Sequence, residues 1–175
     1  MLDLCCGLGG VSRRFRAAGW EVVGVDLAEW VKPDVVCDVR ALALRPSSRF
    51  DFIWASEPCT QYSRRAQPGL YPNEPPPDLS VAYAIREIIR AFNPPKWTVE
   101  NVHGARPYYR HIFGQVRALV PGHAFWGSGF LLPMTAPHKH NVGQQSHERI
   151  RKAKRAIIPA AIPDAIIAQL GGPTP

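Results

Sequence analysis

Length, composition and charge narrow what this chain can be. It has 175 residues, of which 46% are hydrophobic, enough to bury a core as one domain and too apolar for a disordered chain. Lysine and arginine number 21 against 14 acidic residues, and the net charge of +7 fits either a nucleic-acid partner or simple solubility. No apolar run approaches the roughly 20 residues of a membrane span, and no signal peptide precedes the first expected strand. We therefore expect a cytoplasmic protein without a membrane partner.

Short apolar segments alternate with amphipathic ones through the first hundred residues. Gly19 is the expected C-cap of the first helix, Pro94-Pro95 ends the second, and the proline-rich segment 64–77 is expected to be a loop. Alternation at such short intervals predicts an α/β fold with a mostly parallel sheet. Strands are expected at 1–5, 21–25, 35–37, 50–55 and 97–99, and helices at 11–18 and 80–92.

In the second part of the chain, the sequence predicts an antiparallel element at one edge of the sheet. A helix is expected at 109–120, and the aromatic segment 123–132 is expected to add one antiparallel strand or hairpin. Residues 146–155 form a basic stretch, and 162–170 are expected to form a closing apolar helix. We find no internal repeat and no linker that would divide the chain, which indicates a single domain over 1–175.

Three successive strand ends carry residues suited to a nucleoside cofactor. The glycine-rich turn Gly7–Gly10 follows the first strand, where missing side chains let backbone N–H groups approach a ligand at a helix N-terminus. Asp26 closes the second strand, where a carboxylate would accept both ribose hydroxyls, and Asp38 closes the third, within reach of an adenine amino group. Each acid taken singly is as readily a turn or cap residue. The turn lacks the Walker lysine, so a triphosphate is not expected.

A cysteine and a glutamate follow two further expected strands. Pro58-Cys59 comes just after the strand at 50–55, where a parallel sheet presents its chemistry, and Glu100 ends the strand at 97–99. Together they offer a thiol nucleophile and a carboxyl group, although an inert thiol and a surface acid are the alternatives. None of the four cysteines forms a CxxC pair, so no metal is expected and the thiols should be reduced.

Taken in order, these motifs resemble the cytosine-C5 methyltransferases that use S-adenosylmethionine. The similarity covers most of the chain and is greatest to the short, phage-type members that have no separate target-recognition domain. It implies a Rossmann-like class I methyltransferase fold. The matching motifs are Asp3-Leu4-x-x-Gly7-x-Gly9-Gly10, Asp26, Asp38-Val39, Pro58-Cys59-x-x-Tyr62-Ser63 and Glu100-Asn101-Val102.

The resemblance implies that Cys59 and Glu100 are catalytic. Cytosine C5 is a poor nucleophile, so a thiolate first adds to C6 and makes C5 enamine-like, while the glutamic acid donates to N3 and accepts from N4. The cofactor is S-adenosylmethionine, and S-adenosylhomocysteine is the product. The implied cofactor site comprises Asp3, Leu4, Gly7, Leu8, Gly9, Gly10, Asp26, Leu27, Asp38, Val39 and Pro58. Expected substrate contacts are Ser63, Arg64, Arg65, Asn101, Arg149 and Arg151, although the basic stretch that holds the last two fits a solvated face equally well.

Several positions depart from the family pattern. Glu57 stands where a proline or small residue is usual, and its charge would raise the pKa of the neighbouring thiol unless Arg64 or Arg65 neutralises it. Thr60 replaces the usual glutamine. The Gln-x-Arg-x-Arg element is not recognisable, and His138-Lys139-His140 occupies its approximate place without a third metal ligand.

The preferred function at this point is cytosine-C5 methylation of DNA. Only about 45 residues separate Glu100 from the basic segment, too few for a separate recognition domain. We therefore expect single-stranded or distorted DNA as substrate, or help from a homodimer or partner chain. The first alternative is the same chemistry on a free cytosine nucleotide or on RNA. The second is a non-catalytic or partner-dependent nucleic-acid-binding subunit.

Overall fold

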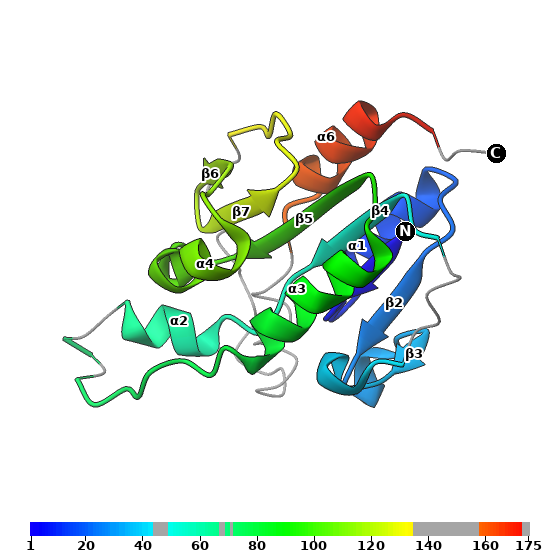
Figure 1. Cartoon of the computed structure of the whole chain (residues 1–175). Coiled ribbons are helices and arrows are strands. Elements are labelled where there is room, and N and C mark those ends of the chain that lie inside the picture. Colours follow the sequence, from blue (N-terminus) through cyan, green and yellow to red (C-terminus); the bar gives the residue numbers. More distant parts are fainter. Residues whose placement is uncertain (44–48, 67–68, 71, 135–157, 173–175) are drawn as a thin grey trace, which may run out of the picture.

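The computed structural model describes residues 1–43, 49–66, 69–70, 72–134 and 158–172, which build a seven-stranded sheet with helices on both faces (Figure 1). The strand order is β3-β2-β1-β4-β5-β7-β6. Pairing is parallel from β3 to β5, whereas β7 runs antiparallel to both β5 and β6. The expected mostly parallel sheet with an antiparallel edge is confirmed, and it is compatible with a Rossmann-like fold. The strands are β1 Leu2–Leu4, β2 Val23–Asp26, β3 Val35–Val36, β4 Phe52–Ala55, β5 Lys96–Asn101, β6 Ala118–Val120 and β7 His123–Gly127.

The helices divide between the two faces of the sheet. α1 and α6 cover one face and α3 and α4 the other (Figure 1). Side-chain alternation along β4 produces this division: Phe52 and Trp54 join the core under α1 and α6, and Ile53 joins the core under α3. The helices are α1 Gly10–Ala17, α2 Thr60–Arg65, α3 Ser80–Phe92, α4 Arg106–Phe113 and α6 Ala161–Leu170, with short 3-10 turns η1 Glu29–Val31, η2 Val39–Ala41 and η3 His103–Ala105.

The amphipathic pattern of α3 explains how this helix packs. Ala82, Ile85 and Ile89 recur at helical spacing and are buried against the sheet. Burying one large aliphatic side chain completely contributes about 1.5–3 kcal/mol. Asn93 adopts a left-handed conformation at the C-cap (φ 42°), and Pro94 then prevents continuation, so the helix ends where the sequence predicted.

The helix expected at 109–120 is wrong. α4 begins at Arg106 and ends at Phe113, because Gly114 adopts a positive φ of 84° that breaks the helical path. Residues 118–120 instead form β6, which pairs with β7 as a hairpin. Short apolar runs such as this one are ambiguous between helix and strand, and here the neighbouring strand decides.

Further differences from expectation concern β5, α2 and β7. β5 continues to Asn101, so Glu100 lies inside the strand, opposite Phe125 of β7, and not beyond its end. The residues after Cys59 form the short helix α2, which the sequence did not predict. β7 ends at Gly127 rather than at 132, and Gly127 has a positive φ of 105°, which departs from extended strand geometry. In contrast, the closing helix is confirmed within one residue as α6.

A search of the described helices for membrane spans finds none with the length and apolar character required. The basic stretch at 146–155 lies outside the described residues.

Candidate active site at the carboxyl edge of the sheet

The topology creates a natural ligand crevice between β1 and β4. After β1 the chain moves outward to β2 and β3 on one side, then returns to β4 and β5 on the other. Parallel α/β sheets bind ligands at such a switch point, outside the carboxyl ends of the strands. The expected glycine turn follows β1, and Cys59 follows β4, so both lie at this point.

The glycine turn is built as a backbone cradle and is anchored by Asp26. Gly7 (φ 53°) and Gly9 (φ 68°) are left-handed, a conformation that L side chains rarely adopt, and no atom lies within 4 Å of a Cβ built at Gly7. Asp26 Oδ2 accepts the Gly7 N–H at 2.8 Å, and Oδ1 accepts the Ala28 N–H at 2.8 Å. Each oxygen keeps one lone pair for a ligand hydroxyl. Asp26 therefore orients the turn as well as being available to a ligand.

The residues before the glycine turn support it from below. Asp3 and Leu4 are buried in β1, and Asp3 accepts a hydrogen bond from the Ser12 hydroxyl in α1. Burial raises the pKa of Asp3 to about 7, with the Ser12 bond acting in the opposite direction. These two side chains thus stabilise the strand–turn–helix unit, while Leu8, Gly9 and Gly10 are half-buried in the turn itself.

Asp38 lies at the third strand end, already engaged in an ion pair. Its carboxylate accepts from the Arg40 backbone N–H at 2.9 Å and from the Arg40 guanidinium at 2.5 Å, and these bonds lower the pKa of Asp38 to about 2. Val39 is buried behind it, whereas Leu27, which follows β2, is 66% exposed. The edge thus offers a carboxylate together with an apolar side chain open to a ligand.

Cys59 lies at the start of α2, and its half-buried thiol is influenced by Glu100. Desolvation raises the pKa of the Cys59 thiol, the negative charge of Glu100 raises it further, and a hydrogen bond with Ser63 lowers it. The structure thus brings together the two residues expected to be catalytic, with Ser63 beside them. Pro58 is exposed at the same edge.

Glu100 has a partner that the sequence did not reveal. Its Oε1 lies 2.7 Å from Nδ1 of His123, the first residue of β7, and both side chains are largely buried. The segment at 123–132 was expected to be a strand, but only its antiparallel register beside β5 shows that His123 reaches Glu100.

Glu57 belongs to a buried network with two tyrosines and not with the arginines. It is 4% exposed, and its Oε1 accepts hydrogen bonds from the hydroxyls of Tyr62 and Tyr109. Oε2 is also buried and has no hydrogen-bond partner among the described residues. Asn101, expected to contact substrate, donates to the Tyr109 hydroxyl at 3.0 Å and to the Glu57 carbonyl at 3.4 Å. Burial raises the pKa of Glu57, which favours its neutral form.

The two arginines considered as neutralising partners of Glu57 instead contact the loop after α2. Arg65 donates to the Tyr108 hydroxyl at 2.7 Å and to the Glu74 carbonyl, and Arg64 lies 3.9 Å from the Glu74 carboxylate. The tyrosine hydroxyls, and not guanidinium groups, are the hydrogen-bond partners of the Glu57 carboxyl group. In addition, the charge that acts on the Cys59 thiol is that of Glu100.

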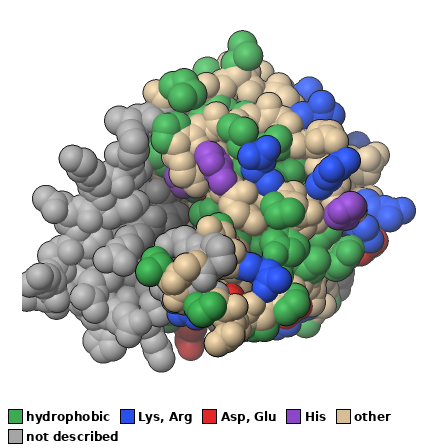
Figure 2. All heavy atoms as spheres, turned by 90° about the vertical axis from the view of Figure 1, so that its left-hand side faces the viewer, with side chains coloured by type: hydrophobic (Ala, Val, Ile, Leu, Met, Phe, Trp, Pro, Cys, Tyr) green, Lys and Arg blue, Asp and Glu red, His purple; other side chains and the backbone are tan. Residues whose placement is uncertain are grey.

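The face that carries α2 and α4 presents several basic groups. Figure 2 shows Lys, Arg and His side chains spread among apolar ones on this side of the molecule. Four arginines of these two helices are exposed: Arg64, Arg65, Arg106 and Arg110. Arg149 and Arg151, as well as His138, Lys139 and His140, lie outside the described residues, so their expected roles remain predictions.

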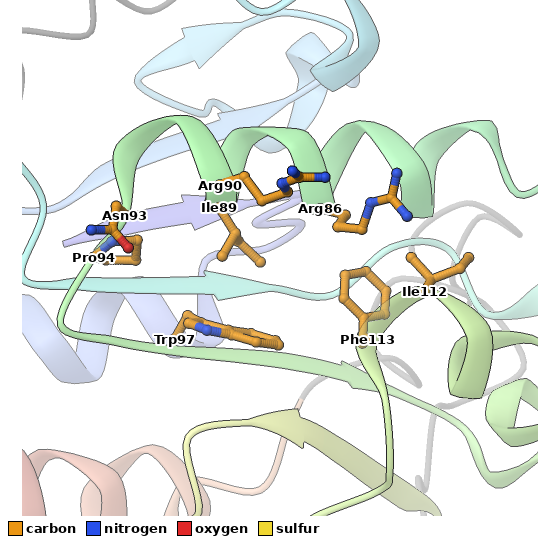
Figure 3. A pocket seen from close by; sticks show the side chains of 8 residues that line it. All are labelled: Arg86, Ile89, Arg90, Asn93, Pro94, Trp97, Ile112 and Phe113. Carbon is orange, nitrogen blue, oxygen red and sulfur yellow. The ribbon is translucent and has the colours of Figure 1, made fainter.

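A separate pocket of about 270 Å³ opens between α3, α4 and the start of β5 (Figure 3). Its lining includes none of the residues expected to bind cofactor or substrate. Its floor is apolar, with Ile89, Trp97 and Phe113, and Arg86 and Arg90 project from α3 along one side. Arg86 is paired with the neighbouring Glu87 at 2.8 Å, so part of its charge is already compensated.

Over the described residues, no cluster of three histidine, cysteine or acidic side chains is arranged to hold a metal ion. A scan against protein-family models finds no match to this chain, and a search of curated proteins likewise finds none.

Proposed function

We propose that this chain is an S-adenosylmethionine-dependent enzyme that methylates C5 of cytosine, with DNA as its substrate. The observation that carries the proposal is that Cys59 follows β4 while Glu100 lies near the carboxyl end of β5, the strand that pairs with β4 in the parallel part of the sheet. A nucleophile and an acid at the switch point of an α/β sheet meet the requirements of addition to a pyrimidine ring.

The described residues fit an adenosine-containing cofactor. The left-handed glycine turn leaves open space where side chains would otherwise stand, Asp26 keeps lone pairs for ribose hydroxyls, and Leu27 with Asp38 offers an apolar and an acidic contact for the base. When bound, S-adenosylmethionine would supply an electrophilic methyl group.

The chain's own residues account for activation of the cytosine ring. The Cys59 thiol first loses its proton to solvent, the thiolate sulfur then forms a bond to C6, and the displaced π electrons move toward C5 and N3. Glu100, in its protonated form, gives its proton to N3, so the adduct carries no net charge from the addition. After C5 has been substituted, a solvent water takes the C5 proton, the S–C6 bond breaks with its electrons going to sulfur, and the N3 proton returns to Glu100. The hydrogen bond with Ser63 lowers the pKa of the Cys59 thiol and so opposes the increase caused by desolvation.

DNA is preferred over a free nucleotide because of the charge distribution. The chain carries a net charge of +7, and exposed arginines of α2 and α4 flank the edge that holds Cys59. A base in duplex DNA must leave the stack to reach a thiol, at a cost of a few kcal/mol. Since a protein of this size has little surface to offset that cost, we propose that it acts on single-stranded or distorted DNA, or with a second copy or partner chain.

Methyl transfer from labelled S-adenosylmethionine to DNA, to RNA and to dCMP, each tested separately, distinguishes the candidates. The proposal predicts incorporation into DNA by the wild type, a loss with Cys59→Ser and activity close to wild type with Cys37→Ser, a matched thiol on another strand end. Binding to DNA should weaken steeply with salt. Methylation of dCMP alone, independent of salt, would favour the nucleotide alternative, and DNA binding without any methylation would favour the non-catalytic subunit.

A further inference from the structure

The contact between Glu100 and His123 joins two neighbouring strands of the sheet and is largely buried. Glu100 lies on β5 and His123 on the antiparallel neighbour β7, where Asn101 pairs with Ala124. Nδ1 and Oε1 are 2.7 Å apart, and the side chains are 16% and 8% exposed for His123 and Glu100 respectively. A pair that is screened so well from water retains much more interaction energy than an exposed one.

A second histidine fixes the backbone that carries His123. Nε2 of His103, in η3, lies 3.0 Å from the Val120 carbonyl and 3.1 Å from the His123 carbonyl. A protonated Nε2 donates to both carbonyls and so clamps the tight turn between β6 and β7, where Gly122 has a φ of 86°. The His123 ring also lies beside the Phe125 ring, with centroids 6.3 Å apart. Backbone and ring are therefore both held in place beside Glu100.

We propose that His123 is a positioning residue for Glu100 in the methylation reaction. With Nδ1–H donating to Oε1, the carboxyl group is held in one orientation: Oε2 carries the proton for N3, and the second lone pair of Oε1 stays available to accept from N4. When the proton on Oε2 passes to N3 of the cytosine, Glu100 becomes a carboxylate, and the Nδ1–H hydrogen bond strengthens because its acceptor is now charged. No proton leaves His123 in this step. The inference rests on the proposed function and adds a residue to it.

Other ionisable groups near the pair do not replace His123 in this role. The Cys59 thiol interacts with Glu100 from the start of α2, but its thiolate would repel the carboxylate rather than stabilise it. The His103 ring contacts the main-chain carbonyls of Val120 and His123. Among the described interactions of Glu100, the imidazole of His123 is the hydrogen-bond partner of its side chain.

The test compares two substitutions of similar shape, His123→Asn and His123→Leu, because only the asparagine keeps an N–H donor near the position of Nδ1. His123→Leu should lower kcat about 10- to 100-fold, the worth of one charge-assisted hydrogen bond, with little change in KM for DNA or in affinity for S-adenosylhomocysteine. His123→Asn should recover a large part of that loss. His111→Asn, at an exposed position on α4, is the matched control and should behave as wild type.

A second readout separates the acid step from methyl transfer. Without cofactor, addition of Cys59 to C6 with protonation at N3 allows the C5 hydrogen of cytosine to exchange with water, so release of tritium from 5-tritiated DNA reports the addition alone. His123→Leu should slow this release by the same factor as it slows methylation.

Equal activity of His123→Leu and wild type would overturn the inference, and so would equal losses in both variants, since these would indicate a packing role. If the wild type neither exchanges tritium nor methylates DNA, the proposed function itself fails. Thermal unfolding of each variant checks that its fold is retained.

Discussion

Replacing Glu57 should reveal how much the carboxyl group buried near Cys59 in sequence contributes to the free energy of unfolding. Glu57 accepts hydrogen bonds from Tyr62 and Tyr109 while it is 4% exposed. Glu57→Ala leaves two buried hydroxyls without their acceptor, at about 1–3 kcal/mol each, and adds a cavity. Allowing for partial relaxation, we expect a loss of about 3–5 kcal/mol in the free energy of unfolding. Glu57→Gln keeps the volume and one acceptor oxygen, and should cost about 1 kcal/mol or less at pH 5.

The pH dependence of the same variants supplies a sharper test. Burial raises the folded-state pKa of Glu57 above its ordinary value of 4.5. Below pH 4.5 the carboxyl is protonated in both states and contributes no penalty. As pH rises from 4.5 through the raised folded-state pKa, the unfolded state ionises first, so stability falls by up to about 1.4 kcal/mol per pH unit. Glutamine does not ionise, so the free energy of unfolding of Glu57→Gln should not show this part of the decrease. Relative to wild type, the stability of this variant should therefore increase between pH 5 and 8.

Urea unfolding at several pH values measures both effects, and Glu87→Gln, on the exposed face of α3, is the control for loss of a charge. Because Asp3 and the other carboxyl groups are present in every variant, their titration cancels in the comparison. Parallel stability curves for wild type and Glu57→Gln across this range would refute the assignment of a neutral, buried Glu57. If Glu57→Ala lowered the free energy of unfolding by less than about 1 kcal/mol, the hydrogen bonds of Glu57 would not have the stabilising role assigned to them.

Three further predictions concern the cofactor turn, the thiol and α2. Asp26→Ala should weaken S-adenosylhomocysteine about 10- to 100-fold by calorimetry, and undiminished affinity would contradict its role. Because burial raises the pKa of Cys59, the rate at which iodoacetamide alkylates this thiol, followed by peptide mass spectrometry, should climb about tenfold per pH unit between pH 6 and 8.5, and a plateau below pH 8 would contradict this. Gly104→Ala places a Cβ 2.5 Å from the Tyr62 carbonyl and should cost about 1–3 kcal/mol in urea unfolding, whereas Gly129→Ala, in open space, should not.

The parts of the fold that follow from local sequence were predictable. The glycine turn after β1, the acids Asp26 and Asp38 at or just after the ends of β2 and β3, and the amphipathic spacing of α3 each depend on neighbouring residues, and the structure agrees with them. The β6–β7 hairpin was mistaken for a continuing helix, because the expected helix at 109–120 was extended through Gly114, the residue whose positive φ ends α4.

The inner contacts of the site could not be predicted in the same way. Glu57 and Tyr109 are 52 residues apart, and Glu100 and His123 are 23 apart on strands whose register is set by three-dimensional pairing. A glutamate beside the nucleophile therefore suggested an arginine partner nearby in sequence, while the structure satisfies it with tyrosine hydroxyls from α2 and α4.

The central claim is that Cys59 attacks cytosine, and covalent trapping tests it most directly. DNA containing 5-fluorocytosine, incubated with the protein and S-adenosylmethionine, should give a stable adduct because fluorine cannot leave C5 as a proton does. Peptide mass spectrometry should place the adduct on Cys59, and Cys59→Ser should form none. An adduct on Cys5, Cys6 or Cys37, or none with a protein that binds both cofactor and DNA, would contradict the account.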